Sequence, residues 1–351
     1  MNPEVLQLTG FSQQPAWLPW AVQYFFIIGL SVGAFLITLP AYVLRWSSDQ
    51  RAARAALLVA LTTGLAAPVA LLADLHQPDR FWHFYAFGQG SSWMAWGSFF
   101  LPAYVGLLTL YGWLALRPEL AQRARDPGPV GRLAGLLAGS GVALPRARRS
   151  VGWVTAIAAA LVALYTGAEV AVVAARPLWH SALLPVVYLT TGIAGGAGLA
   201  LLFAGRFETP RRTLFRWLWA ALALTGLAVF AWMLGLSGSG TAHALLRLAT
   251  EYRPMPFGLW LLVGLLLPLV LAWFHRAPIA AGLLAIAGAW MWRWEIFMAG
   301  QGIPKNDAGF YGVHLPLGPE GLLGIVGTLG LWVLIALALT ALLRPTANVQ
   351  G

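Results

Sequence analysis

The feature that most constrains this chain is a series of long apolar segments joined by polar connections. A helix that crosses a bilayer needs about 20 consecutive, mostly apolar residues. The stretches of about that length are 20–44, 55–73, 93–116, 151–175, 180–205, 214–236, 257–275, 278–299 and 321–343. Only 10% of the residues are charged, whereas a soluble domain carries roughly 25%. We therefore predict an all-α integral membrane protein with about nine transmembrane helices.

Basic residues are distributed unevenly between the two predicted sides of the membrane. Sixteen arginines lie in connections on one side, and four arginines with one lysine lie on the other. Because cytoplasmic connections are enriched in Lys and Arg, this predicts an outside N-terminus and an inside C-terminus. The segment 117–150 holds seven of the sixteen and is predicted to be a cytoplasmic linker. The net charge of +10 is thus interpreted as contact with membrane lipid, and no nucleic-acid partner is predicted.

Polar side chains gather between Asp74 and Tyr85, at the predicted outer end of the second segment. These twelve residues hold two acids, two histidines, one arginine and four aromatic residues. Ionisable groups near membrane depth are costly and are usually functional. We predict that Asp74 and His76 handle protons, since a histidine ring titrates near neutral pH, and that Arg80 helps to bind a ligand.

Three other predicted helices bring polar groups to the same depth. Gln23 and Tyr24 lie near the outer end of the first segment, and Arg293 lies within the last two turns of the eighth. Glu169 lies near the outer end of the fourth segment, and Tyr165 is one turn deeper on the same face because residues i and i+4 align. We predict that these groups meet in one functional pocket.

A purely structural role is the alternative for these residues. Arg293 then pairs with Glu169 or Glu295, and the aromatic residues form an interfacial belt. Two features of the sequence limit the cofactors that the pocket can hold. None of the six histidines lies in the middle of a predicted helix, and the chain has no cysteine. We therefore predict no haem, iron–sulfur cluster or metal site in this chain. Carboxylates, a histidine and aromatic rings suit a quinol headgroup with an apolar tail.

The sequence resembles the polysulfide reductase membrane-anchor family of the NrfD/PsrC type, and within it the membrane subunits of tetrathionate reductases. The resemblance covers residues from about 15 to 305. It is carried by 17–26 (WLPWAVQYFF), 74–85 (DLHQPDRFWHFY), 92–97 (SWMAWG), 165–167 (YTG) and Arg293 with 300–304 (GQGIP).

This resemblance implies two four-helix bundles and one extra C-terminal helix, which we place at residues 1–205 and 206–351. It implies a menaquinol or ubiquinol site near the outer face of the first bundle. Tyr165 would contact the headgroup, with Asp74 and His76 beside it.

Related anchors carry Asn and His at the headgroup end of the first helix. This chain has Trp20, Gln23 and Tyr24 there, so Gln23 is the expected contact from that helix.

The resemblance also implies partners: a four-cluster ferredoxin-like iron–sulfur subunit and a molybdopterin catalytic subunit, on the periplasmic side of a bacterial inner membrane. Such a complex would respire tetrathionate, polysulfide or a related sulfur compound. Without haem to carry electrons inward, we expect the iron–sulfur partner to dock on the outer loops 74–92, 237–256 and 300–320. The alternatives are a quinone-reducing or proton-translocating homologue, an ion or small-solute transporter, and an anchor without a quinone site.

Overall fold

The computed structural model describes residues 17–75, 77–204, 208–304, 309–312 and 315–343, which form helices and connecting loops without β-strands. The α-helices are α1 (Pro19–Tyr42), α2 (Gln50–Asp74), α3 (His83–Ala86), α4 (Trp93–Arg123), α5 (Pro129–Ala138), α6 (Pro145–Ala171), α7 (Leu184–Phe203), α8 (Glu208–Met233), α9 (Ser239–Arg247), α10 (Pro254–Leu259), α11 (Leu267–Trp273), α12 (Pro278–Trp294) and α13 (Leu322–Leu343). The shorter elements are a 3₁₀ turn, η1 (Pro78–Arg80), and three π-helical turns, η2 (Leu248–Tyr252), η3 (Trp260–Leu266) and η4 (Glu295–Ala299).

Eight helices in the described residues are long and apolar enough to cross a membrane: α1, α2, α4, α6, α7, α8, the continuous helix from Pro254 to Trp273, and α13. The prediction of an all-α multi-pass membrane protein is therefore confirmed. The predicted segment 278–299 is divided between the 17 residues of α12 and the π-helical turn η4. The number of nine spans and the outside N-terminus stay predictions.

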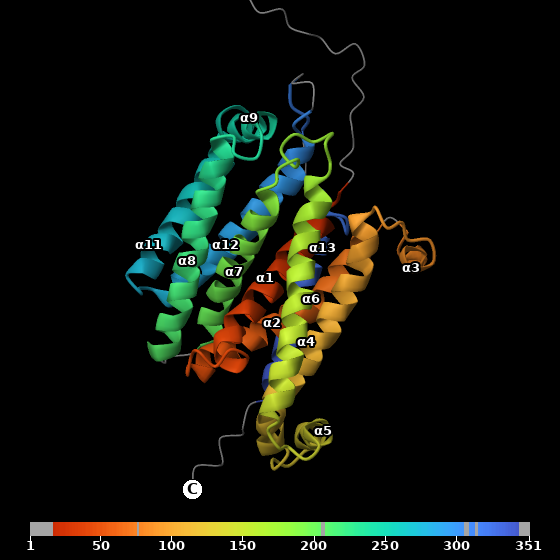
Figure 1. Cartoon of the computed structure of the whole chain (residues 1–351), viewed down its shortest axis with the longest axis vertical. Coiled ribbons are helices and arrows are strands. Elements are labelled where there is room, and N and C mark those ends of the chain that lie inside the picture. The colour runs from red at the N-terminus through yellow and green to blue at the C-terminus, as the bar shows by residue number, and fades with distance from the viewer. Residues whose placement is uncertain (1–16, 76, 205–207, 305–308, 313–314, 344–351) are drawn as a thin grey trace, which may run out of the picture.

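Helix α7 lies between two groups of helices (Figure 1). On one side it packs against α8 and α12, and on the other against α1, α2 and α6. Helix α4 packs against α6, and α13 lies against α2 and α1. Because α7 contacts helices of both groups, it connects the two predicted bundles, and their division at residues 1–205 and 206–351 stays a prediction.

The glycines of α7 allow helix backbones to approach closely. A Cβ on Gly192 would lie 2.6 Å from the carbonyl oxygen of Gly29 in α1, and one on Gly198 would lie 2.8 Å from that of Gly282 in α12. Small residues at such crossings let transmembrane helices pack by direct backbone contact. These glycines therefore allow close packing of α7 against α1 and α12.

The predicted linker 117–150 is largely helical, because α4 continues to Arg123, α5 follows, and α6 begins at Pro145. Helix α5 starts with Pro129 at its first turn, directly after Gly128 (φ 108°), and ends at Gly139 (φ 57°). Proline at the start and glycine after the end are the expected boundary signals of a helix.

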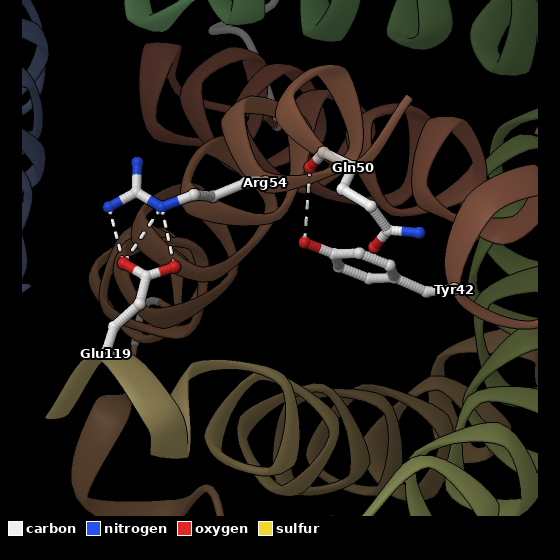
Figure 2. Close-up of polar contacts among 4 residues, drawn as sticks. All are labelled: Tyr42, Gln50, Arg54 and Glu119. Carbon is white, nitrogen blue, oxygen red and sulfur yellow. Dashed lines mark hydrogen bonds and ion pairs between the residues drawn. The ribbon is translucent and has the colours of Figure 1, made fainter. Parts of the chain in front are cut away.

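An ion pair joins α2 to α4 at this arginine-rich end of the molecule. Arg54 donates from Nε (2.7 Å) and Nη2 (2.6 Å) to the Glu119 carboxylate (Figure 2). Nearby, the Tyr42 hydroxyl lies 3.5 Å from the Gln50 carbonyl oxygen. The ion pair links the start of α2 to the last part of α4, and the Tyr42–Gln50 contact links the end of α1 to the start of α2.

Candidate functional site

A cavity of about 440 Å³ opens where α2 and α6 end and α4 begins. Its wall is mostly apolar and draws on α1, α2, α4, α6 and the loop that contains α3. The lining residues are Trp17, Phe25, Pro68, Leu71, Leu72, Asp74, Leu75, Phe81, Phe84, Tyr85, Met94, Gly97, Ser98, Leu101, Pro102, Tyr165 and Glu169. Ligand pockets typically have this character, with a few polar groups on an apolar wall.

Two carboxyl groups and two phenols supply the ionisable groups of the described cavity wall, and one of the phenols, Tyr85, comes from the loop after α2. Asp74 is the last residue of α2, while Tyr165 and Glu169 lie one turn apart near the end of α6. Their i, i+4 spacing places them on the same face of the helix, as the sequence predicted. The structure thus brings three of the predicted site residues to one cavity.

The Tyr165 hydroxyl forms a hydrogen bond with a second buried tyrosine. Tyr24 of α1 and Tyr165 are both almost fully buried, and their hydroxyl oxygens lie 2.6 Å apart. Tyr24 does not line the cavity itself. Its role in the geometry is therefore to fix the Tyr165 side chain, since a buried hydroxyl is costly to leave without a partner.

Gly97 of α4 makes room for the Tyr165 ring. A Cβ at this position would lie 2.3 Å from Cε2 of Tyr165, so no larger residue fits without moving the ring. Helix α4 begins just before this point, where the Ser92 side chain accepts a hydrogen bond from the Ala95 backbone N–H. The SWMAWG segment therefore both starts a helix and shapes the cavity.

Aromatic side chains from the loop after α2 form the outer wall. Phe81, Phe84 and Tyr85 line the cavity, and the Tyr85 hydroxyl donates to the Ser98 carbonyl oxygen at 2.9 Å. These three lie in the loop 74–92, which was predicted to dock a partner and whose aromatic rings were predicted to suit a quinol headgroup. Trp82 does not line the cavity and packs edge-on against His83 with ring centroids 4.1 Å apart.

The remaining predicted residues lie outside the cavity or outside the described part of the chain. Gln23 is buried in α1 but is absent from the cavity wall. Arg80 lines a neighbouring, more open cavity of about 520 Å³, together with His83. His76 lies outside the described residues, so its placement stays a prediction.

Arg293 is fully buried, and neither Glu169 nor Glu295 is its partner. Its guanidinium donates to the Thr191 hydroxyl and, at 2.8 Å, to the Tyr188 carbonyl oxygen, and it lies over the Tyr188 ring. Glu295 instead binds Arg253 in a two-bond ion pair (2.8 and 3.0 Å). The structural alternative that paired Arg293 with Glu169 or Glu295 is therefore wrong within the described residues.

Arg293 also lies outside the main cavity. It lines a small cavity of about 20 Å³ between α1, α6 and α7, and Phe25 lines both cavities. Phe25 therefore separates Arg293 from the cavity that holds Tyr165 and Glu169. Of the four helices predicted to bring polar groups to one pocket, α2 and α6 do so. Helix α1 contributes Phe25 to the cavity wall in place of Gln23, and α12 contributes no residue to it.

The cavity can accept protons and enclose a flat ring with an apolar substituent. No group of three or more His, Asp or Glu side chains in the described ranges is placed to hold a metal ion. Two carboxyl groups beside a phenol offer proton acceptors and a hydrogen-bonding group, and leucine, phenylalanine and proline side chains form the remaining wall. This arrangement suits an amphipathic, proton-releasing ligand.

Comparison with known proteins gives a consistent result over most of the chain. A family model described as "Polysulphide reductase, NrfD" matches residues 7–305, a range that contains every residue of the cavity. The C subunit of tetrathionate reductase from Salmonella typhimurium is 36% identical over 360 residues, which cover 97% of this chain and 95% of that protein.

Two further relatives match less closely. The C subunit of polysulfide reductase from Wolinella succinogenes is 29% identical over 304 residues, covering 79% of this chain and 92% of that protein. The C subunit of selenate reductase from Mesobacillus selenatarsenatis is 28% identical over 223 residues, covering 60% of this chain and 52% of that protein.

Proposed function

We propose, from the premise that this chain belongs to the polysulphide reductase NrfD family, that it is the quinol-oxidising membrane subunit of a bacterial reductase complex. Membership of the family confirms the resemblance predicted from the motifs at 17–26 and 74–85. The relatives are C subunits of tetrathionate, polysulfide and selenate reductases, and the chain is a multi-pass membrane protein. A membrane-anchor role in a reductase complex follows from these two findings.

The observation that carries the quinol assignment is the composition of the cavity wall. Among the described residues of the wall, Asp74, Tyr165, Glu169 and Tyr85 are the ionisable members, and the rest of this wall is mainly hydrocarbon and aromatic. An isoprenoid quinol has the matching character, with two ring hydroxyls and a long apolar tail. A volume of about 440 Å³ is in the range of known small-molecule sites.

Each polar residue has a separate role in this proposal. A quinol supplies two electrons and two protons when it is oxidised to the quinone. Tyr165, held by Tyr24, orients the headgroup through its hydroxyl. Asp74 accepts a proton at the outer end of α2, and Glu169 passes protons outward one turn beyond Tyr165.

The electrons need an acceptor close to the cavity, because no redox centre is predicted in this chain. We propose that a four-cluster iron–sulfur subunit docks on the loops 74–92, 237–256 and 300–320 at the periplasmic face of the inner membrane and passes the electrons to a molybdopterin subunit. Crosslinking of the assembled complex tests this. Links from the partner only to 45–55 and 117–150 would place the partner at the opposite end and refute both the docking and the placement of the quinol site and its electron acceptor on the same side.

Replacing Tyr165 with Phe should weaken quinol binding and leave the complex assembled. The substitution removes one hydrogen-bonding group from the headgroup and from Tyr24, so we expect KM for quinol to rise roughly threefold to tenfold. Steady-state quinol oxidation by the purified complex measures this.

Tyr104→Phe is the matched control. Tyr104 is equally buried in α4, its hydroxyl lies 2.9 Å from that of Ser31, and it does not line the cavity. This variant loses the same group and should keep the KM of the wild type. An unchanged KM in Tyr165→Phe, or an equal rise in both variants, would count against headgroup contact.

A further inference from the structure

A further cavity, of about 550 Å³, lies at the end of the molecule opposite the quinol cavity, between the end of α1 and the start of α6. The residues that line it are Ala41, Tyr42, Arg45, Ser47, Gln50, Pro145, Arg146, Arg148 and Arg149. Four of these nine residues are arginines, and none of the nine has a carboxylate side chain. The cavity is therefore strongly positive.

The arginines of this cavity are arranged around Tyr42. The Arg148 guanidinium lies over the Tyr42 ring, 4.4 Å from its centroid, and its buried Nε has no hydrogen-bond partner among the described residues. Arg146 and Arg149, one turn of α6 or less away, are exposed. Arg45 has a φ of 62°, a conformation that is uncommon for residues other than glycine. The cavity thus contains a hydrogen-bond donor without an acceptor among the described residues, the Nε of Arg148, and exposed positive charge on Arg146 and Arg149.

Two carboxylates at this end of the molecule, Glu119 and Asp49, contact other groups. Glu119 holds Arg54 in the ion pair of Figure 2, beside Tyr42. Asp49 accepts hydrogen bonds from the Ala52 backbone N–H (3.0 Å) and from the Thr213 hydroxyl (2.6 Å). Within the described part of the chain, no carboxylate forms an ion pair with any of the four cavity arginines.

The position of the cavity points to the membrane surface as the source of an anion. It is formed where two membrane-spanning helices end, and Trp46 next to Arg45 is 80% exposed. Tryptophan is enriched at the level of the lipid headgroups. The N-terminus of α6 adds the positive end of a helix dipole.

We propose that this cavity binds the phosphate of an anionic phospholipid, such as phosphatidylglycerol. Arginine recognises phosphate oxygens through paired N–H donors, and basic pockets between transmembrane helices bind anionic headgroups. Arg146 and Arg149 offer exposed donors to such a phosphate, and Arg148, whose Nε has no hydrogen-bond partner among the described residues, lines the same cavity. This site is separate from the quinol cavity, and its existence does not depend on the quinol assignment.

Native mass spectrometry of the full chain in detergent, titrated with phosphatidylglycerol or phosphatidylcholine, tests the proposal. The wild type should bind phosphatidylglycerol in preference. Arg146→Gln with Arg149→Gln should weaken that binding roughly 30-fold, from the usual contribution of two surface arginines. Both residues are exposed, and Arg148 is left in place, so the packing on Tyr42 is retained.

Arg125→Gln with Arg132→Gln is the matched control. These two exposed arginines lie near the same end of the molecule but outside the cavity, and their loss removes the same formal charge. This variant should retain most of the affinity. Equal weakening in the two double variants would overturn the proposal, because general attraction would then explain the binding.

Two other results would also overturn the assignment to an anionic lipid. Equal binding of phosphatidylcholine by the wild type would show that net lipid charge is not recognised. Displacement of phosphatidylglycerol by millimolar inorganic phosphate, with phosphate itself retained by the wild type and lost in the Arg146/Arg149 variant, would assign the cavity to a free anion.

Discussion

Replacing Asp74 with Asn should reduce the rate of quinol oxidation by the assembled complex roughly 10²- to 10⁴-fold, the usual contribution of a positioned general base. Asp74 ends α2 at the wall of the cavity that holds Tyr165 and Glu169. The amide of Asn has nearly the same shape as the carboxylate but does not accept a proton. The rate is measured with excess quinol and an artificial acceptor for the iron–sulfur partner.

Asp79→Asn provides the control for this experiment. Asp79 belongs to the 3₁₀ turn η1 five residues further on, is exposed, and does not line the cavity. It should retain the wild-type rate. Near-normal quinol oxidation by an assembled Asp74→Asn complex would remove Asp74 from the proton path.

Replacing Glu169 with Gln should slow turnover on the order of 10²-fold and change KM for quinol little. Glu169 lies on the cavity wall one turn beyond Tyr165, where a proton leaves the headgroup region. Because Arg293 is bound by Thr191 and backbone carbonyls, the substitution leaves no buried arginine without its partner. A fall in rate can therefore be attributed to proton transfer.

Glu251→Gln is the comparison for Glu169→Gln. The Glu251 side chain is 55% exposed and forms an ion pair with Arg247. This variant should behave as the wild type does. If Glu169→Gln raises KM tenfold and leaves the maximal rate unchanged, Glu169 binds the headgroup and does not move protons. Loss of assembly in Glu169→Gln alone would instead indicate a structural role.

Apolar segment length predicted most of the fold. Eight of the predicted segments correspond to helices able to span a membrane, since the bilayer fixes the length of a spanning helix. The predicted segment 278–299 has the bounds of α12 followed directly by the π-helical turn η4, and apolar length does not predict this change of helix type at Glu295. Helix α5 carries clear boundary residues, Gly128, Pro129 and Gly139, yet the arginines around it favoured the prediction of a linker.

The candidate site was predictable where helical periodicity alone decides the geometry. The alignment of Tyr165 with Glu169 follows from the i, i+4 relation. By contrast, Phe25 and Gly97 reach the cavity wall because of the way α1, α4 and α6 pack. The sequence pattern does not specify this packing. The hydrogen bond between Tyr24 and Tyr165 joins two helices, so it could not be predicted from spacing either.

Arg293 shows why a buried charge is difficult to interpret from sequence. The sequence predicted a place for Arg293 in the pocket and, as the alternative, a carboxylate partner, but Thr191, the Tyr188 carbonyl and the Tyr188 ring surround its guanidinium. Neutral acceptors of this kind leave no signature in the spacing of acids and bases.

The most direct test of a quinol site between α2, α4 and α6 is photoaffinity labelling of the purified complex with an azidoquinone, followed by peptide mapping. We predict labels within 68–75, 81–85, 94–102 or 165–169, which are lost when excess natural quinol competes. Labelling that competes with natural quinol but maps only to α8–α13, or to the arginine-rich end of the molecule, would contradict a quinol site at this cavity.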